Sequence, residues 1–155
     1  LVLNLTRHCD RDQQTTNEHI RQALQELGSE RLDHGLKVLG KPELIAMARD
    51  KGGTFTLCPS PNDVIRPGRS RQDIRDMLAA GLKITINSDD PGYMQSVYMT
   101  ESFAKAQSAA DLTQDELIQI SRNAFQAAWI SDDERALYLD ALETFARNHR
   151  VEMSS

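Results

Sequence analysis

The sequence predicts an α/β protein built on a parallel sheet, and three observations support that prediction. Four short strand-like runs alternate with helical stretches, which is the pattern of successive parallel β/α units. Side chains capable of chemistry follow the ends of these runs, as expected where parallel strands end at one common edge. The chain has 155 residues, enough for one domain with a buried core.

The first two thirds of the chain contain the predicted strands. In order, we expect a strand at 1–6, a helix at 16–27, a strand at 31–33, a helix at 42–49, a strand at 54–57, a loop at 60–68, a helix at 70–80 and a strand at 82–86. Gly28 and Gly81 are placed to end the helices before them. Pro42 stands in a first helical turn, where its missing N–H is tolerated. Ser70 and Asp73 form a weak capping box.

The last third is predicted to be helical. One helix is expected over 100–109. Thr113 caps the next helix, with Glu116 at the position that completes a capping box. Ser131 and Glu134 repeat the pattern at the start of the last helix. The strands are therefore expected to be followed by a group of C-terminal helices.

Composition excludes several classes of function. The net charge is −5 and acids and bases are interspersed, which argues against a nucleic-acid-binding surface. No apolar run approaches the roughly 20 residues of a membrane span. Cys9 and Cys58 are too few for a disulfide framework and fit a reducing cytoplasm; as ordinary small residues near strand ends they need no special role.

The most informative segment is the end of the strand at 82–86, where two carboxylates stand side by side. Charges placed near a buried strand end must be paired or bound to a metal. Consecutive strand residues point to opposite sides, so Asp89 and Asp90 are expected to do different jobs, one on a metal and one on a substrate. A simple turn is the alternative. His8 and His34, each at the end of an earlier strand, favour the functional interpretation.

Strand-end placement is common to two architectures. A closed β/α barrel and an open doubly wound sheet both bind ligands at the C-terminal ends of their strands. No glycine-rich dinucleotide motif and no Walker lysine loop follows a strand, which weakens the nucleotide-binding alternative.

Four motifs together resemble the adenosine/adenine deaminase family of the amidohydrolase superfamily. They are His8, Arg31-Leu32-Asp33-His34-Gly35, Cys58-Pro59 and Asn87-Ser88-Asp89-Asp90-Pro91, and the likeness continues to Arg122-Asn123-Ala124-Phe125. The resemblance implies a β/α barrel with one zinc ion. It also implies hydrolysis of a purine 6-amino group to a 6-oxo group, with release of ammonia.

The resemblance assigns a role to each candidate residue. His8 and Asp89 are implied as zinc ligands, and His34 as the histidine that holds the attacking hydroxide and relays its proton. Asp90 is implied as the partner of a hydrogen bond that involves purine N7. A zinc ion lowers the pKa of its bound water to about 7, which supplies the nucleophile that adds to C6.

The first departure from the family concerns the general acid. The family has His-Ala-Gly-Glu where this chain has His8-Cys9-Asp10-Arg11, so Arg11 stands at the place of the glutamate. We take Asp10 as the acid, with Asp12 as the alternative. An absent acid, meaning a changed substrate or lost activity, is the third interpretation.

The second departure concerns the metal. The family binds zinc through a His-x-His pair on its first strand, and this chain has no such pair, which leaves two ligands missing from a tetrahedral site. A complete barrel has eight strands in about 250 residues. Since the chain opens inside a strand without an initiator methionine, we expect the C-terminal half of a barrel over residues 1–150 and a frayed tail over 151–155. Such a half-barrel should be poorly soluble or dimerise, and bind zinc weakly.

The substrate class follows from smaller likenesses. Asp33 precedes the relay histidine, as in adenine-type members, whereas adenosine-type members have glycine there. Residues 88–93 also resemble the adenine-type motif. Adenine or a modified adenine is therefore favoured, with adenosine and N6-substituted adenines still open. Two other functions remain: another amidohydrolase-type metal hydrolase that cleaves an amide or phosphoester, and a non-catalytic purine-binding fragment. The sequence leaves the oligomeric state open.

Overall fold

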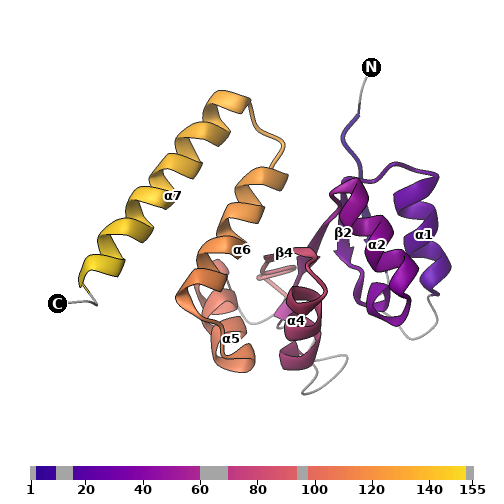
Figure 1. Ribbon diagram of the computed structural model, residues 1–155, viewed down its shortest axis with the longest axis horizontal. Helices are drawn as coiled ribbons and strands as arrows, with labels where there is room; N and C mark the ends of the chain where they lie inside the picture. Colours follow the sequence, from indigo (N-terminus) through magenta and orange to yellow (C-terminus); the bar gives the residue numbers. More distant parts are fainter. Residues whose placement is uncertain (1–2, 10–15, 60–69, 94–97, 153–155) are drawn as a thin grey trace.

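A four-stranded parallel sheet is the centre of the molecule (Figure 1). The computed structural model describes residues 3–9, 16–59, 70–93 and 98–152. The strands, in spatial order, are β1 (Thr6–Cys9), β2 (Arg31–His34), β3 (Thr54–Leu57) and β4 (Lys83–Ile86). Each strand pairs in parallel with the next one in the chain, which confirms the predicted α/β fold with a parallel sheet.

Helices connect the strands and continue beyond the last one. They are α1 (Asn17–Gln25), the 3-10 helix η1 (Leu36–Gly40), α2 (Pro42–Lys51), α4 (Ser70–Ala79), α5 (Met99–Ala110), α6 (Gln114–Ala127) and α7 (Asp132–Glu152). Each predicted helix is present within a few residues of its expected bounds. Helix α7 ends at Glu152, two residues into the segment expected to be a frayed tail. The loop expected at 60–68 falls outside the described residues.

The first strand begins later than the sequence predicted. It was expected at 1–6, but β1 starts at Thr6, and His8 lies within it rather than after it. The ladder begins where the Leu5 carbonyl accepts hydrogen bonds from the backbone N–H groups of Glu30 (3.0 Å) and Arg31 (3.4 Å). Leu3 is 68% exposed and lies before this point. Pairing with β2 therefore decides the strand, not the apolar character of its first residues.

The two faces of the sheet have opposite character because the strands pair in register. One set of side chains is mostly apolar, packs toward the helices and forms the core: Cys9, Leu32, Phe55, Leu57, Ile84 and Ile86. Arg7 of β1 shares the row of Leu32 but is exposed. The alternate positions are polar: Thr6, His8, Arg31, Asp33, Thr54, Thr56, Lys83 and Thr85. A parallel sheet with two covered apolar faces would read as continuous hydrophobic runs. This sheet instead has one packed face and one polar face.

Helices α4, α5 and α6 are joined by one arginine. Arg75 of α4 donates to the Ala110 carbonyl (2.6 Å) at the end of α5, and to the Asp111 carbonyl just after it. The same side chain forms an ion pair with Glu116 at the start of α6 (2.6 Å). Helix α6 then lies along β4, where Asn123 donates to the Ile84 carbonyl (3.0 Å). These contacts hold the C-terminal helices against the sheet.

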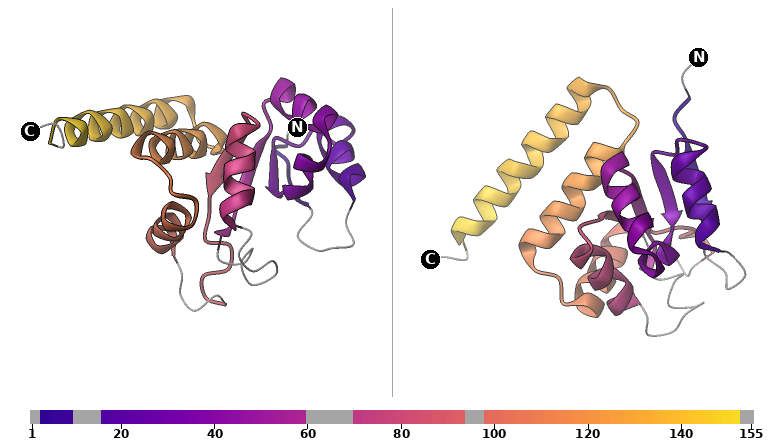
Figure 2. Two further views of the ribbon diagram at one scale, coloured as in Figure 1. Left: turned by 60° about the horizontal axis from the view of Figure 1, so that its bottom comes forward. Right: turned by 45° about the vertical axis from the view of Figure 1, so that its right-hand side comes forward.

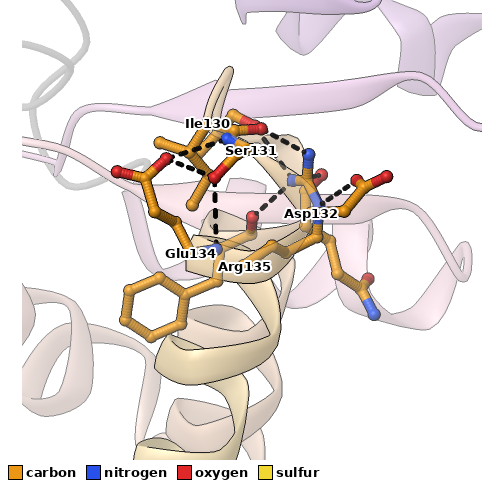
Figure 3. A network of polar contacts seen from close by, with 8 residues as sticks. Ile130, Ser131, Asp132, Glu134 and Arg135 are labelled. Carbon is orange, nitrogen blue, oxygen red and sulfur yellow. Dashed lines mark hydrogen bonds and ion pairs between the residues drawn. The ribbon is translucent and has the colours of Figure 1, made fainter.

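A second arginine fixes the turn between α6 and α7 (Figure 3). The Arg135 guanidinium donates to four backbone carbonyls, which belong to Phe125, Gln126, Ala128 and Ile130. Phe125 and Gln126 lie in the last turn of α6, where backbone carbonyls have no partner within the helix. Ser131 and Glu134 form the predicted reciprocal cap of α7. From this turn α7 runs alongside α6 (Figures 1 and 2). No helix among the described residues is long and apolar enough to span a membrane.

The α6–α7 turn also reaches the N-terminal ends of the strands. The Trp129 indole donates to the Glu30 carboxylate (2.9 Å), and the Arg31 guanidinium lies 3.5 Å from the centre of the indole ring. These residues border a cavity of about 470 Å³ at this end of the sheet. Among the described residues, a second hollow is bordered by the polar residues that follow the strands.

We predict that Thr113→Ala lowers the free energy of unfolding by about 1 kcal/mol. The Thr113 hydroxyl accepts from the Glu116 backbone N–H (3.2 Å), while the Glu116 carboxylate accepts from the Thr113 N–H (2.8 Å). Urea denaturation measures the loss. Thr100→Ala, at an exposed position in the first turn of α5, is the matched control and should change stability by less than about 0.5 kcal/mol. Equal losses would contradict the capping role.

Glu116 should also make the free energy of unfolding depend on pH in the acidic range. The Thr113 N–H, followed by the Arg75 guanidinium, lowers the pKa of this carboxyl below its ordinary value of 4.5, although burial opposes the effect. A lowered folded pKa stabilises the protein above 4.5, and that contribution is lost as the pH falls through the folded value. Glu116→Gln should therefore show a smaller loss of stability than the wild type between pH 5 and pH 3.

Candidate active site

A cleft of about 400 Å³ extends along the polar face of the sheet to the C-terminal ends of the strands. Its lining comes from β1, β2 and β3, from residues that follow β3 and β4, and from the start of α5: Thr6, His8, Arg31, Asp33, His34, Thr56, Cys58, Asn87, Ser88, Asp89 and Met99. Parallel strands end at the same edge, so residues distant in sequence converge there. Most of the residues that the motifs singled out therefore share one cleft.

His34 is the most constrained side chain in the cleft. It is the last residue of β2, its side chain is buried, and its φ of 64° is left-handed. Gly35 follows with a φ of 62°, and its N–H donates to the Cys9 carbonyl (2.9 Å). Register alone would place His34 in the row of Cys9 and Leu57, on the helix-packed face. The left-handed turn at the strand end explains how its imidazole reaches the cleft.

Asp89 reaches the same point from β4. Its carboxylate Oδ2 lies 3.9 Å from His34 Nε2, and it too has a left-handed backbone, with a φ of 59°. The approach to this turn is held by Asn87, whose N–H donates to the Leu57 carbonyl (2.8 Å) and whose amide donates to Thr85 (2.8 Å). The neighbouring strands thus fix where the carboxylate sits.

His8 approaches His34 from β1. The two imidazole rings meet edge to face, with centroids 4.9 Å apart. His8 is exposed, whereas His34 is buried. The predicted ligands His8 and Asp89 therefore both lie beside the predicted relay histidine.

Cys58 joins this group from the end of β3. The ligand atoms of His34, Cys58 and Asp89 all lie within 4.8 Å of one another. Imidazole, thiol and carboxylate together suit zinc better than magnesium or calcium, which prefer oxygen ligands alone. On donor chemistry, the residues that meet here fit the zinc ion that the sequence led us to expect.

Asp33 is held on the polar face of the sheet by two neighbouring strands. Its Oδ1 accepts hydrogen bonds from Thr56 Oγ1 of β3 (2.6 Å) and Thr6 Oγ1 of β1 (3.2 Å). In-register pairing brings Thr56 opposite Asp33. The two hydroxyls hold one oxygen of a carboxylate that borders the cleft.

The structure does not place the remaining predicted site residues in the cleft. Asp90 is exposed and is not among the cleft-lining residues, and its carbonyl accepts from the Tyr93 N–H in a turn (3.0 Å). Asp10, Asp12 and Arg11 lie outside the described residues. The proposed acid and the proposed N7 partner therefore remain predictions.

Sequence reasoning placed Cys58 in a strand-end motif without giving it a role, and it did not single out the threonines around Asp33. Cys58 was interpreted as an ordinary small residue, and Thr6 was placed at the end of its strand rather than the beginning. The signal that could have found them is the strand pairing, because His8, Asp33 and Thr56 occupy equivalent positions in β1, β2 and β3.

Comparison with known proteins points to one family. A family model described as adenosine deaminase matches residues 3–145. An uncharacterized deaminase of Schizosaccharomyces pombe is 54% identical over 146 residues, or 94% of this chain and 43% of that protein. An adenine deaminase of Rhodopseudomonas palustris is 32% identical over 139 residues, or 88% of this chain and 40% of that protein.

Solved structures agree with this result. A Burkholderia ambifaria amidohydrolase, crystallised with bound zinc, superposes with a TM-score of 0.84 at 26% identity, over 97% of this chain and 42% of that one. The four-stranded sheet is a partial TIM barrel, which confirms the predicted architecture. The chain spans about two fifths of the length of the proteins it matches.

We predict that Gly35→Ala lowers the stability of the folded protein more than Gly28→Ala does. Both glycines have a positive φ, which costs an alanine about 1–2 kcal/mol. A Cβ at Gly35 would also meet the Phe55 ring at 2.6 Å, whereas nothing lies within 4 Å of one at Gly28. Overpacking should add about 1–3 kcal/mol at Gly35 alone. Thermal unfolding of both variants measures the difference, and equal costs would contradict it.

Proposed function

Because the chain belongs to the adenosine deaminase family, we propose that it is the C-terminal part of an enzyme that hydrolyses the amino group of a 6-aminopurine. The observation that carries the proposal is the meeting of three side chains at the strand ends. His34 lies 3.9 Å from Asp89, and its ring contacts that of His8. A buried imidazole beside a carboxylate and a second histidine is an arrangement suited to moving a proton near a metal.

The metal would be a single zinc ion. His8 and Asp89 are the ligands we propose from this chain, completed by a His-x-His pair from the part of the protein that precedes it. Bound zinc lowers the pKa of water to about 7 and so supplies a nucleophile at neutral pH.

The side chains of this chain carry the proton transfers. Oxygen from water bonds to C6 of the purine, the bond between C6 and the amino nitrogen breaks, and ammonia leaves. His34 accepts the water proton and passes it on toward the leaving amine. An acid must protonate the purine ring so that C6 accepts the nucleophile, and we assign this task to Asp10, with Asp12 as the alternative. Asp90 is the partner of a hydrogen bond that involves N7 and orients the ring.

The preferred substrate is adenine or a modified adenine rather than adenosine. A free base carries an N–H on its five-membered ring that a carboxylate can accept, whereas a nucleoside carries ribose there. Asp33 borders the cleft with a carboxylate that Thr56 and Thr6 hold in place. The adenine deaminase relative supports this choice. N6-substituted adenines and adenosine remain the competing substrates. We propose that the enzyme acts in the cytoplasm, in keeping with its small number of cysteines.

One observation favours a second candidate function. Arg11 stands where the family has its acid, and an arginine guanidinium, which does not lose its proton in proteins, cannot protonate a purine ring as a carboxylic acid does. The alternative is therefore a non-catalytic purine-binding protein. It predicts purine binding without ammonia release, whereas another amidohydrolase-type metal hydrolase predicts turnover of amides or phosphoesters instead.

We predict that the complete protein releases ammonia from adenine faster than from adenosine. The experiment measures ammonia from adenine, adenosine and N6-alkyl adenines, with kcat/KM for each. Asp89→Asn should reduce both bound zinc and turnover, whereas Asp115→Asn, exposed at the start of α6, should change neither. Purine binding with no ammonia from any substrate would contradict the proposal and favour the alternative.

A separate prediction concerns the acid. Asp10→Ala in the complete protein should reduce kcat by about 10²–10⁴-fold, the usual contribution of a general acid. Asp12→Ala should have a small effect. The opposite ranking would move the assignment to Asp12, and full activity in both variants would remove the acid from this segment.

A further inference from the structure

We infer that the cavity at the N-terminal ends of the strands binds a small phosphate-bearing anion, with Arg31 and Lys83 as the groups that hold the phosphate. The cavity measures about 470 Å³, which is within the range of small-molecule sites. Of the residues that carry the inference, Lys83, Thr54 and Trp129 border this cavity and not the cleft that contains His34. The inference therefore does not rest on the deaminase proposal.

Two cations reach the cavity from one row of the sheet. Arg31 pairs in register with Thr54, and Thr54 with Lys83, so the three side chains leave the sheet on the same face. Neighbouring strands lie about 4.8 Å apart, which puts the Cα atoms of Arg31 and Lys83 roughly 10 Å apart. Two long side chains with this separation can hold one tetrahedral phosphate between them, and the Thr54 hydroxyl below can donate to it.

The donors of Arg31 are not used by the rest of the described structure. Its guanidinium lies 3.5 Å from the centre of the Trp129 ring, and no described residue accepts a hydrogen bond from it. Its Nε is closed off from solvent and lacks a partner among the described residues. A shielded donor without an acceptor is unfavourable. Rotation of the guanidinium off the indole ring would turn its donors toward a phosphate in the cavity, where arginine binds two oxygens at once.

The other charged groups around the cavity are already engaged. Arg135 donates to backbone carbonyls at the end of α6 and after it, and the Glu30 carboxylate accepts from the Trp129 indole. The lining residues carry three positive charges and one negative charge, which favours an anion. Arg31 and Lys83 are the cations of this lining whose donors have no acceptor among the described residues.

The cavity is larger than a bare phosphate requires. Ala128, Trp129 and Ile130 give it an apolar wall, and the Trp129 side chain is 43% exposed. An organic group attached to the phosphate can pack against this wall. The ligand class is therefore a phosphate monoester of a small organic molecule, such as a sugar phosphate. Inorganic phosphate shares the same recognition chemistry and is the competing source of the anion.

The test is isothermal titration calorimetry of the complete protein with ribose 5-phosphate, inorganic phosphate and ribose. None of these compounds contains a purine. The wild type should bind one equivalent of ribose 5-phosphate, bind inorganic phosphate more weakly, and not bind ribose. Lys83→Gln should weaken the binding of ribose 5-phosphate at least about tenfold, because one charged contact is lost, and Lys83→Arg should retain it. Lys41→Gln removes an exposed lysine just before α2 and is the matched control, which should bind like the wild type.

Trp129 provides a second readout that places the ligand in this cavity. The fluorescence of Trp129 is taken as the difference between the wild type and Trp129→Phe. It should change as ribose 5-phosphate is added, because the Arg31 guanidinium leaves the ring. Far-ultraviolet circular dichroism checks that each variant folds.

Three results would overturn the inference. They are equal binding of ribose 5-phosphate by the wild type and Lys83→Gln, binding of ribose as tight as that of its phosphate, and no binding of either phosphate compound. The last result would leave the two cations as partners of the nearby helix carbonyls alone. Equal affinity for inorganic phosphate and ribose 5-phosphate would support the site and assign it to free phosphate.

Discussion

The in-register pairing of four parallel strands is the constraint on which the site depends. It places one polar row across the sheet, composed of His8, Asp33, Thr56 and Thr85. Side chains alternate along a strand, so a slip of one residue would turn a polar row into the helix-packed core and expose its apolar neighbours. Burial of Leu32, Phe55 and Ile84 therefore fixes the register, and the register fixes where the chemistry converges.

The strand ends add what regular pairing cannot provide. His34 and Asp89 both adopt left-handed backbones, which cost about 1–2 kcal/mol each for residues other than glycine. The surrounding structure holds these conformations: the Gly35 N–H is bonded to β1, and Asn87 is bonded to β3. The same turns bring a buried imidazole and a carboxylate to 3.9 Å. Strain at the end of a rigid ladder is how this fold aims two side chains at one point.

Local signals predicted most of the fold, while long-range pairing set the rest. The cap of α6 by Thr113 and that of α7 by Ser131 were predictable because both partners lie within four residues. The predicted start of β1 was wrong because the hydrogen bonds that the Leu5 carbonyl accepts beside β2 mark where the strand begins, and the local sequence does not show them. The site histidines and Asp89 followed from strand-end motifs. The threonines around Asp33 did not, because their contacts appear only when three strands are aligned.

The central claim is that these strand ends belong to an enzyme that exchanges a purine amino group for an oxygen from water. The most direct test is deamination by the complete protein in water enriched in oxygen-18, with mass spectrometry of the purine product and a parallel ammonia assay. The account predicts one labelled oxygen at C6 for each ammonia released. Purine that stays bound and unchanged, or ammonia released with an unlabelled product, would contradict it.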